Sequence, residues 1–410
     1  MDQHKLYRTI KLLGEAKFRT EEELLGHILQ TIIQGEEFPI RGGRIWKLDP
    51  SSGTYRVTSQ FGEIDHIQRS FRIRVPDYPL FTQLPKRGTL VGTETNKYLR
   101  ERGIRHYSAT GVGEKVQWKG YTLFQYVIAI NADFLKQEML YALNIIGSAL
   151  TTALQNRRIE SKAKQLERDI DEARSIQKSI LPAHEQRFHN YDIYGISLPD
   201  RVVGGDFFDY LQAADDKDRL GVVIGDATSK GLSAAAQALY VSGALRMGIE
   251  FHTKISTLVG KINQLVNRTF TVEHFISMVY AELSSSDNGL VFYVNAGHSN
   301  PILLHANTDI TEPLHATGQL IGPFPAEKYR SEYALMLKGD ILLMYTDGIV
   351  EAMNEQREMY GEQRLINKLR DNRGRTPKEI CQVILEDVQI HNRLVDYSDD
   401  KTIVVIKRNR

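Results

Sequence analysis

The sequence reads DRLGVVIGDATSKGLSAAAQALYVSGAL from Asp218 to Leu245, and this stretch predicts a strand, a turn and a helix in succession. Residues Leu220–Ile224 are continuously apolar, as in a buried strand, and Asp226 lies at the end of that strand. The alanine-rich segment after Lys230 favours a helix. An aspartate at such a boundary is commonly a turn residue, and the stretch taken alone favours that role over metal binding.

Three other strand boundaries in the same part of the chain carry an aspartate. In GDILLMYTDGIVEA the apolar strand Ile341–Tyr345 ends just before an aspartate and a glycine. In YSDDKTIVVIKR two aspartates precede the last strand, Thr402–Ile406, and in VVGGDFFDY an aspartate follows two glycines. One such aspartate indicates a turn. Four such boundaries, without paired histidines or several cysteines, indicate an all-oxygen site for Mg²⁺ or Mn²⁺. The residues are Asp206, Asp226, Asp347, Asp399 and Asp400.

Carboxylates that gather in one pocket repel one another, and their pKa values rise unless a cation compensates the charge. A pair of divalent cations would supply that compensation. Such a pair would also lower the pKa of a shared water and stabilise an oxyanion during in-line displacement. The pattern of aspartates therefore favours hydrolysis of a phosphoryl group.

The stretch VVGGDFFDY (Val202–Tyr210) carries two aspartates three residues apart. In a strand such residues point to opposite faces, so Asp206 and Asp209 are not expected to reach one metal unless the backbone bends. The glycines before Asp206 allow a close approach, which favours Asp206 as the ligand. We expect Asp209 to support the site or a turn, and Phe207 and Phe208 to lie in the core.

Five segments together resemble a known family. They are VGGDFFDY, GDATSKGLSAA, NAGHSNPILL, YTDGIVEA and SDDKTIVVI. Their order and approximate spacing resemble those of the metal-dependent PPM (PP2C-like) serine/threonine phosphatases, specifically the bacterial sporulation-stage-II-E type. The resemblance covers Ile180 to Lys407, and ARSIQKSILP is similar to the segment that usually precedes this domain. It implies an α+β chain whose part from 183 to 410 is a PP2C-type αββα sandwich, and the turn signal Asn288–Gly289 fits a hairpin of that fold.

The resemblance also implies a role for each aspartate. Asp226 looks like the ligand that bridges two Mn²⁺ or Mg²⁺ ions, with the backbone carbonyl of Ala227 as a further ligand. Asp347 and Asp399 resemble ligands of the first metal, and Asp206 resembles the acidic residue that serves the second. Asp226 and Asp347 are therefore the expected catalytic residues.

The chain departs from the family pattern directly after Asp226. The family commonly has Val-Ser-Gly-Lys-Gly where this chain has ATSKG, so Ser229 replaces a glycine. Thr228 lies where eukaryotic relatives carry a histidine proposed to protonate the leaving group, so the sequence assigns no general acid. His298 is expected to order a strand-end turn. Supporting or uncertain positions are Asp209, Asp400, Thr228 and Arg201, the last either a phosphate contact or a solvated side chain.

Residues 1–132 predict a mixed α and β domain. The segment EEELLGHILQTII has a helical pattern, RGGRIWKLDPSSGTYRVTSQF predicts two strands around Pro50–Gly53, and Tyr121–Asn131 predicts a further strand. This order resembles a GAF-type sensor domain, with a PAS-like domain as the alternative. Such a domain implies a ligand or protein partner whose identity the sequence leaves open.

Residues 133–182 contain no proline before Pro182 and predict one long helix, on the order of 70 Å. Two segments have apolar residues at alternating spacings of three and four, which is a seven-residue repeat. One interpretation is an amphipathic helix packed on its own domain. The other, which we favour, is a parallel coiled coil that joins a homodimer. The segments are Met139, Ala142, Ile146, Ala149 and Ala153, and then, out of phase, Ile159, Ala163, Leu166, Ile170 and Ala173.

Among 410 residues, 52 Lys and Arg nearly balance 51 Asp and Glu, which favours neither a nucleic-acid partner nor an anionic membrane. No apolar run reaches transmembrane length, and the first residues lack the apolar core of a signal peptide, so a cytoplasmic location is expected. The one cysteine, Cys381, excludes an internal disulfide. Its amphipathic surroundings predict a small buried side chain and not a nucleophile.

The resulting hypothesis is a metal-dependent phosphoserine or phosphothreonine protein phosphatase of bacterial signalling. The resemblance implies a phosphorylated STAS-type anti-sigma-factor antagonist as its substrate, and the N-terminal domain would control it through the helix. The alternative is a catalytically inactive scaffold that binds phosphoproteins. Loss of metal-ligand positions would indicate a scaffold, and all four positions are present.

Overall fold

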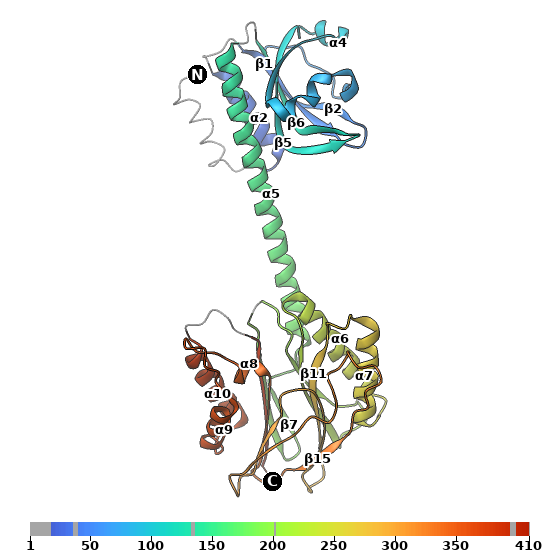
Figure 1. Cartoon of the computed structure of the whole chain (residues 1–410), viewed down its shortest axis with the longest axis vertical. Helices are drawn as coiled ribbons and strands as arrows, with labels where there is room; N and C mark the ends of the chain where they lie inside the picture. Colours follow the sequence, from blue (N-terminus) through green and yellow to red (C-terminus); the bar gives the residue numbers. More distant parts are fainter. Residues whose placement is uncertain (1–17, 36–39, 133–135, 201, 394–398, 410) are drawn as a thin grey trace. The chain divides into compact units, whose positions relative to one another are not determined.

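The computed structural model describes residues 18–35, 40–132, 136–200, 202–393 and 399–409, drawn as ribbons in Figure 1. The chain divides into two compact units, Met1–Gln165 and Leu166–Arg410. Within the described ranges, no helix is both long enough and apolar enough to cross a membrane.

The first unit is built around a six-stranded antiparallel sheet with the strand order β3-β2-β1-β6-β5-β4. The predicted hairpin is present as β1 and β2, and it turns at Gly53, whose φ of 64° suits glycine. The predicted strand Tyr121–Asn131 is β6. The elements are α2 (Glu21–Gln34), β1 (Ile40–Asp49), β2 (Thr54–Gly62), β3 (Arg72–Arg74), η1 (Val75–Asp77), η2 (Pro79–Thr82), α3 (Leu84–Arg87), β4 (Thr89–Thr93), α4 (Lys97–Arg100), β5 (His106–Trp118) and β6 (Tyr121–Ala132).

The two faces of this sheet carry separate cores. On one face, α2 and the first turns of the long helix α5 (Gln137–Ile180) cover the sheet (Figure 1). They bury Ile28 and Leu143 against Ile128. On the other face, the short helices η1, η2, α3 and α4 bury Phe81 and Leu99 against the strands. The sheet therefore separates a helix-packed side from a side covered by short turns.

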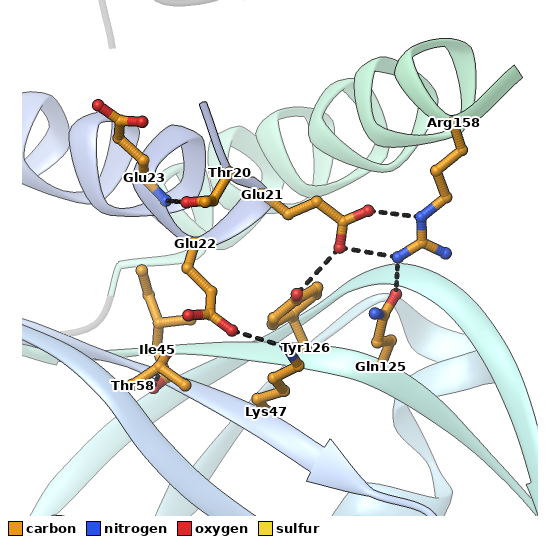
Figure 2. Close-up of polar contacts among 10 residues, drawn as sticks. All are labelled: Thr20, Glu21, Glu22, Glu23, Ile45, Lys47, Thr58, Gln125, Tyr126 and Arg158. Carbon is orange, nitrogen blue, oxygen red and sulfur yellow. Dashed lines mark hydrogen bonds and ion pairs between the residues drawn. The ribbon is translucent and has the colours of Figure 1, made fainter. Parts of the chain in front are cut away.

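A polar network connects α2 to α5 and β6 beside the first of these cores (Figure 2). The Arg158 guanidinium donates to both carboxylate oxygens of Glu21 and to the Gln125 side chain. Tyr126 Oη donates to the same carboxylate over 2.9 Å. Hydrogen bonding from Arg158 lowers the pKa of Glu21, so this carboxylate is charged at neutral pH. The network therefore fixes α5 to the first unit at Arg158.

The long helix predicted from the sequence is α5, with 44 residues. Its first apolar segment packs on the sheet of its own unit, as the alternative interpretation expected. The buried stripe is wider than the narrow seam of a coiled coil, because intervening leucines are buried as well. Its buried residues are Met139, Ala142, Leu143, Ile146, Gly147, Leu150 and Leu154.

The second apolar segment of α5 is exposed. Ile159 and Leu166 are 66% and 60% accessible to solvent, and Ala163 between them is also exposed. Ile170 and Ala173 are partly buried. The five residues Ile159, Ala163, Leu166, Ile170 and Ala173 are called the seam below.

The second unit contains two antiparallel sheets, with strand orders β15-β12-β11-β10-β9 and β14-β13-β16-β17-β8-β7. Three strands predicted beside aspartates are present as β10, β16 and β17. The elements are β7 (Glu185–Phe188), β8 (Tyr191–Leu198), β9 (Phe207–Leu211), β10 (Arg219–Ala227), α6 (Leu232–Ile249), α7 (Ile255–Thr269), β11 (Ile276–Ser284), β12 (Leu290–Ala296), β13 (Ile302–Leu304), β14 (Thr311–Pro313), β15 (Glu332–Leu335), β16 (Ile341–Tyr345), α8 (Asp347–Val350), α9 (Glu362–Asp371), α10 (Pro377–His391) and β17 (Lys401–Arg408).

Helices cover the outer face of each sheet, which gives the layer order αββα (Figure 1). Helices α6 and α7 pack on the first sheet, and α9 and α10 pack on the second. Phe208 lies in the core between the sheets and Phe207 in the core under α6 and α7, so both are core residues as predicted. Cys381 of α10 is fully buried, and burial raises the pKa of its thiol, which is therefore not a nucleophile.

Candidate active site

The end of β10 borders a cleft that contains several carboxylates. Asp226, the residue before the end of this strand, lines the cleft together with Asp200, Asp399 and Asp400. The empty space in the cleft, its mouth included, is about 290 Å³. Burial raises the pKa of Asp226 to about 7, and the negative charges of Asp347, Asp399 and Asp400 add to the rise. Segments that are far apart in the sequence therefore bring carboxylates together here.

Asp206 lies beside Asp226, directly before β9, and is only 4% exposed. Thr346 Oγ1 donates a hydrogen bond to Asp206 Oδ2 over 2.7 Å. Burial raises the pKa of Asp206 well above its ordinary value, and the charge of Asp226 raises it further. The two carboxyl groups are close enough for each to affect the pKa of the other.

Asp347 is the first residue of α8, and Thr346 separates it from β16. Burial raises its pKa and the charge of Asp399 adds to the rise, while the Gly348 N–H and Lys230 oppose it. Lys230 Nζ lies 3.2 Å from Asp399 Oδ2. Burial and the charges of Asp347 and Asp399 also raise the pKa of Glu351, in the first turn after Asp347. Lys230 is thus a cation that approaches this group of acids from the loop before α6.

Asp400 holds the backbone of the glycine pair in VVGGDFFDY. Its carboxylate accepts the N–H of Asp200 at 2.8 Å and the N–H of Gly205 at 2.6 Å. A Cβ at Gly204 would overlap the Asp400 carboxylate, and a Cβ at Gly348 would overlap the Asp400 carbonyl oxygen. Both glycines are therefore required because Asp400 lies against them.

Asp209 contacts a different part of the unit. It is 1% exposed, and Arg246 of α6 donates to its two oxygens over 2.7 and 3.1 Å. Ser242 Oγ donates to it over 3.2 Å. The same Arg246 donates to the carbonyl of Ile180, the last residue of α5, over 2.6 Å. Asp209 thus connects β9 to α6 and, through Arg246, to the end of α5.

The remaining predicted positions have structural contacts. Thr228 Oγ1 donates to the Phe275 carbonyl and accepts the Phe275 N–H, each at 2.8 Å. The Ala227 carbonyl oxygen lies against Gly205, where a Cβ would approach it to 2.7 Å. His298 is buried, with Nδ1 2.6 Å from Ser277 Oγ, and burial lowers its pKa to about 4, so it is neutral. Arg201 lies outside the described residues.

Ser229, which replaces a glycine of the family pattern, has a φ of 92°. This conformation favours glycine and costs a residue with a Cβ on the order of 1–3 kcal/mol. Ser229 Oγ accepts a hydrogen bond from Gln237 Nε2 over 3.2 Å. The loop therefore retains a glycine-type backbone although the glycine itself is replaced.

The donor set fits a hard divalent cation by its chemistry and its charge. The carboxylates and the Ala227 carbonyl offer only oxygen, which Mg²⁺ and Mn²⁺ prefer. The raised pKa values of Asp206, Asp226 and Asp347 indicate negative charge that Lys230 does not compensate. Within the described ranges, no three His, Cys, Asp or Glu side chains are already arranged to hold an ion. A bound cation would have to draw these oxygens closer together.

Sequence reasoning did not assign three residues of this site. Thr346 lies beside Asp347 in YTDGIVEA, and Lys230 lies shortly after Asp226 in GDATSKGLSAA. Their closeness to these aspartates in the sequence was the signal that could have identified them. Gln177 of α5 gave no signal, because a polar residue on a helix is ordinarily solvated. Its Nε2 donates to the Gly204 carbonyl over 2.7 Å, and its Oε1 accepts the Gly204 N–H over 3.3 Å.

Residues 216–409 match the sequence model of the family described as Stage II sporulation protein E (SpoIIE). This part of the chain is a SpoIIE-type PP2C phosphatase domain. The matched residues include Asp226, Asp347 and Asp399, whereas Asp206 lies just before the match.

Two curated proteins are similar in sequence to more than half of this chain. Protein IcfG of Synechocystis sp. is 27% identical over 268 residues, which cover 59% of this chain and 42% of IcfG. Phosphoserine phosphatase RsbU of Bacillus subtilis is 24% identical over 250 residues, which cover 60% of this chain and 71% of RsbU. The chain thus spans less than half the length of IcfG. Among solved structures, the SiaA-PP2C domain of Pseudomonas aeruginosa has a TM-score of 0.52 and 19% identity over 60% of this chain and 98% of that one, which shows the PP2C fold.

Proposed function

We propose that this protein is a Mn²⁺- or Mg²⁺-dependent protein phosphatase that hydrolyses phosphoserine or phosphothreonine. The observation that carries the proposal is a cluster of carboxylates at one cleft. Asp226 lines the cleft with Asp399 and Asp400, and its charge interacts with those of Asp206 and Asp347. The family match and the similarity to phosphoserine phosphatase RsbU support it. The intact set of acidic side chains argues against an inactive scaffold.

Each residue of the site has a distinct role in this proposal. Asp206, Asp226, Asp347, Asp399 and the Ala227 carbonyl would hold two ions. The ions would supply positive charge against the developing phosphoryl charge and lower the pKa of water. Other side chains position the ligands, as Thr346 and Asp400 fix Asp206 and its loop while Lys230 lies against Asp399.

Asp226→Asn tests the proposed activity. The substitution keeps the shape of the side chain but removes its charge, so Mn²⁺-dependent phosphate release from a phosphoserine peptide should fall by roughly 100-fold or more. Asp371→Asn, at an exposed position at the end of α9, is the matched control and should keep the wild-type rate. Wild-type activity in Asp226→Asn, or activity of the wild type that survives EDTA, would contradict the proposal. Phosphopeptide binding without any turnover would favour the scaffold.

The proposed substrate is a phosphorylated STAS-type anti-sigma-factor antagonist in a bacterial signalling pathway. Its support is the resemblance of the five segments to the sporulation-stage-II-E phosphatases and the match of residues 216–409 to that family. A protein substrate would contact surfaces beyond the cleft. The intact phosphorylated antagonist should therefore show a higher kcat/KM than the isolated phosphopeptide that carries the same phosphoserine.

We also propose that the first unit is a GAF-like sensor that acts on the site through α5. Two contacts at the end of this helix support the proposal. Gln177 binds the backbone of Gly204, two residues before Asp206, with two hydrogen bonds. Ile180 binds Arg246, which also holds Asp209. A shift of this end of α5 would therefore act on both the glycine loop and α6.

A homodimer through α5 belongs to the same proposal. The seam places apolar side chains on one face of the helix, and Ile159 and Leu166 remain exposed. Pairing with a second copy would bury them in the way that a coiled coil buries its core positions.

A further inference from the structure

The cleft beside Asp226 is strongly acidic, which is unfavourable for the substrate that the proposed function requires. Its described lining includes the carboxylates of Asp200, Asp226, Asp399 and Asp400. A phosphoserine carries a charge of about −1.5 to −2 near neutral pH, so these carboxylates repel its phosphate. The basic side chain among the described residues that line the cleft is Lys230. Within this lining, its ammonium is therefore the charge that can attract a phosphate.

The backbone that carries Lys230 is held by its neighbours. Gln237 of α6 is 1% exposed, and its Nε2 donates to the Thr228 carbonyl and to Ser229 Oγ, each over 3.2 Å. The Thr228 hydroxyl is in turn joined to the backbone of Phe275 by two hydrogen bonds. These contacts fix the point from which the Lys230 side chain reaches into the cleft.

The ammonium of Lys230 is less restricted than its backbone. The side chain is 37% exposed, and Nζ lies 3.2 Å from Oδ2 of Asp399, whose own side chain is 49% exposed. Ion pairs with this much exposure are weak, because water screens the charges and both side chains lose freedom. A lysine ammonium is also a compact charge with three donors on a flexible four-carbon stem. Lys230 can therefore change partners easily.

The proposed function changes the charges around this ion pair. Asp399 is one of the proposed metal ligands, and a carboxylate that binds a divalent cation attracts a nearby ammonium less strongly. A phosphate in the cleft brings negative charge to the same place. Both changes favour a phosphate oxygen over Asp399 as the partner of Lys230.

We propose that Lys230 binds the phosphate of the substrate, and that its ammonium exchanges Asp399 for a phosphate oxygen once the metal site is occupied. The inference rests on the proposed function, since it requires that Asp399 binds an ion and that the cleft receives a phosphate. It requires no enclosed cavity, because the exposed part of the Lys230 side chain can be reached from solvent.

Lys230→Met tests the exchange by two binding measurements on the full chain. The substitution removes the ammonium and keeps an unbranched side chain. Mn²⁺, titrated by calorimetry into the metal-free chain, should bind roughly two- to fivefold more tightly, because Asp399 loses a competing cation. Inorganic phosphate, titrated into the chain saturated with Mn²⁺, should bind roughly ten- to hundredfold more weakly, because a hydrogen bond between charged groups is lost.

The opposite signs of these two changes separate the exchange from a structural role. Removal of a side chain that only held Asp399 in place would weaken the binding of Mn²⁺ as well. Lys230→Arg keeps a positive charge at this position and should restore most of the affinity for phosphate. The matched control is Lys261→Met, at an exposed position of α7, which should bind Mn²⁺ and phosphate as the wild type does.

Two results from a Lys230→Met variant with the wild-type Tm would overturn the inference. One is weaker binding of Mn²⁺, and the other is phosphate binding equal to that of the wild type. A wild type that binds no Mn²⁺ would overturn both the inference and the proposed function. Because the titrations measure binding and not turnover, the expected changes in a chain that hydrolyses no phosphopeptide would support the inference and contradict only the proposed function.

Discussion

Ser229 has a backbone conformation that is unfavourable for a residue with a side chain. Its φ of 92° costs a residue with a Cβ more than it costs glycine, and the difference exceeds the greater conformational entropy that glycine has in the unfolded chain. Ser229→Gly should therefore raise the free energy of unfolding of the second unit by about 1 kcal/mol. Calorimetric unfolding of the full chain measures this as a higher Tm of that unit's transition.

Two companion variants show whether backbone strain is the cause. Ser229→Ala loses the bond from Gln237 but keeps the strain, so it should be no more stable than the wild type. Ser229→Val should be the least stable, because a branched side chain tolerates positive φ poorly. A Ser229→Gly variant that melts below Ser229→Ala would show that this loop is not strained.

Some individual residues of the site could be predicted from the sequence, and others could not. Asp226 and Asp347 could be found because each follows an apolar run of five residues, and a local pattern is enough to detect that. The mutual effect of Asp206 and Asp226 on their pKa values could not be predicted, because it depends on how β9 and β10 pair. Gln177 could not be found either, since its partner is a backbone group 27 residues away.

Among the helices and strands, the bounds of a buried strand were easier to predict than the different surroundings of the two apolar segments of α5. The run Ile341–Tyr345 has the same bounds as β16, because a buried strand between polar residues has clear ends. The helix carried two repeats of the same spacing, and spacing alone does not show what each repeat packs against. The first covers its own sheet and the second is exposed, a difference that depends on where the sheet ends.

The end of α5 is the element whose contact with the site can be tested by substitution. Gln177→Leu removes both hydrogen bonds to Gly204 and so loosens the loop that carries Asp206. The Mn²⁺ concentration for half-maximal activity should rise roughly tenfold, as for other residues that position a metal ligand. Ser175→Leu, at an exposed position in the same turn, is the control and should leave that concentration unchanged. An unchanged Mn²⁺ requirement in folded Gln177→Leu would remove α5 from the control of this loop.

For the whole molecule, the spacing of the seam would connect the proposed homodimer to the site. The seam ends at Ala173, and the next positions in the same alternation of four and three are Gln177 and Ile180. These two residues make the contacts with Gly204 and Arg246. The spacing of the seam therefore continues into the two residues of α5 that contact the second unit. In the proposed homodimer, a change in how the two copies pair along the seam would shift Gln177, which binds the glycine loop.

Leu166→Glu tests whether the seam holds two copies together. Leu166 is 60% exposed in the single chain, and a carboxylate at this position would be buried against its counterpart in a dimer. An unpaired charge in a coiled-coil core is costly, so the dimer should weaken by roughly 100-fold or more. Sedimentation on the order of tens of micromolar should show the wild type as a dimer and Leu166→Glu as a monomer. Ser161→Glu adds the same charge at an exposed position outside the seam and should remain dimeric. A wild type that sediments as a monomer, or a Leu166→Glu variant that stays dimeric, would show that the exposed seam serves some other contact.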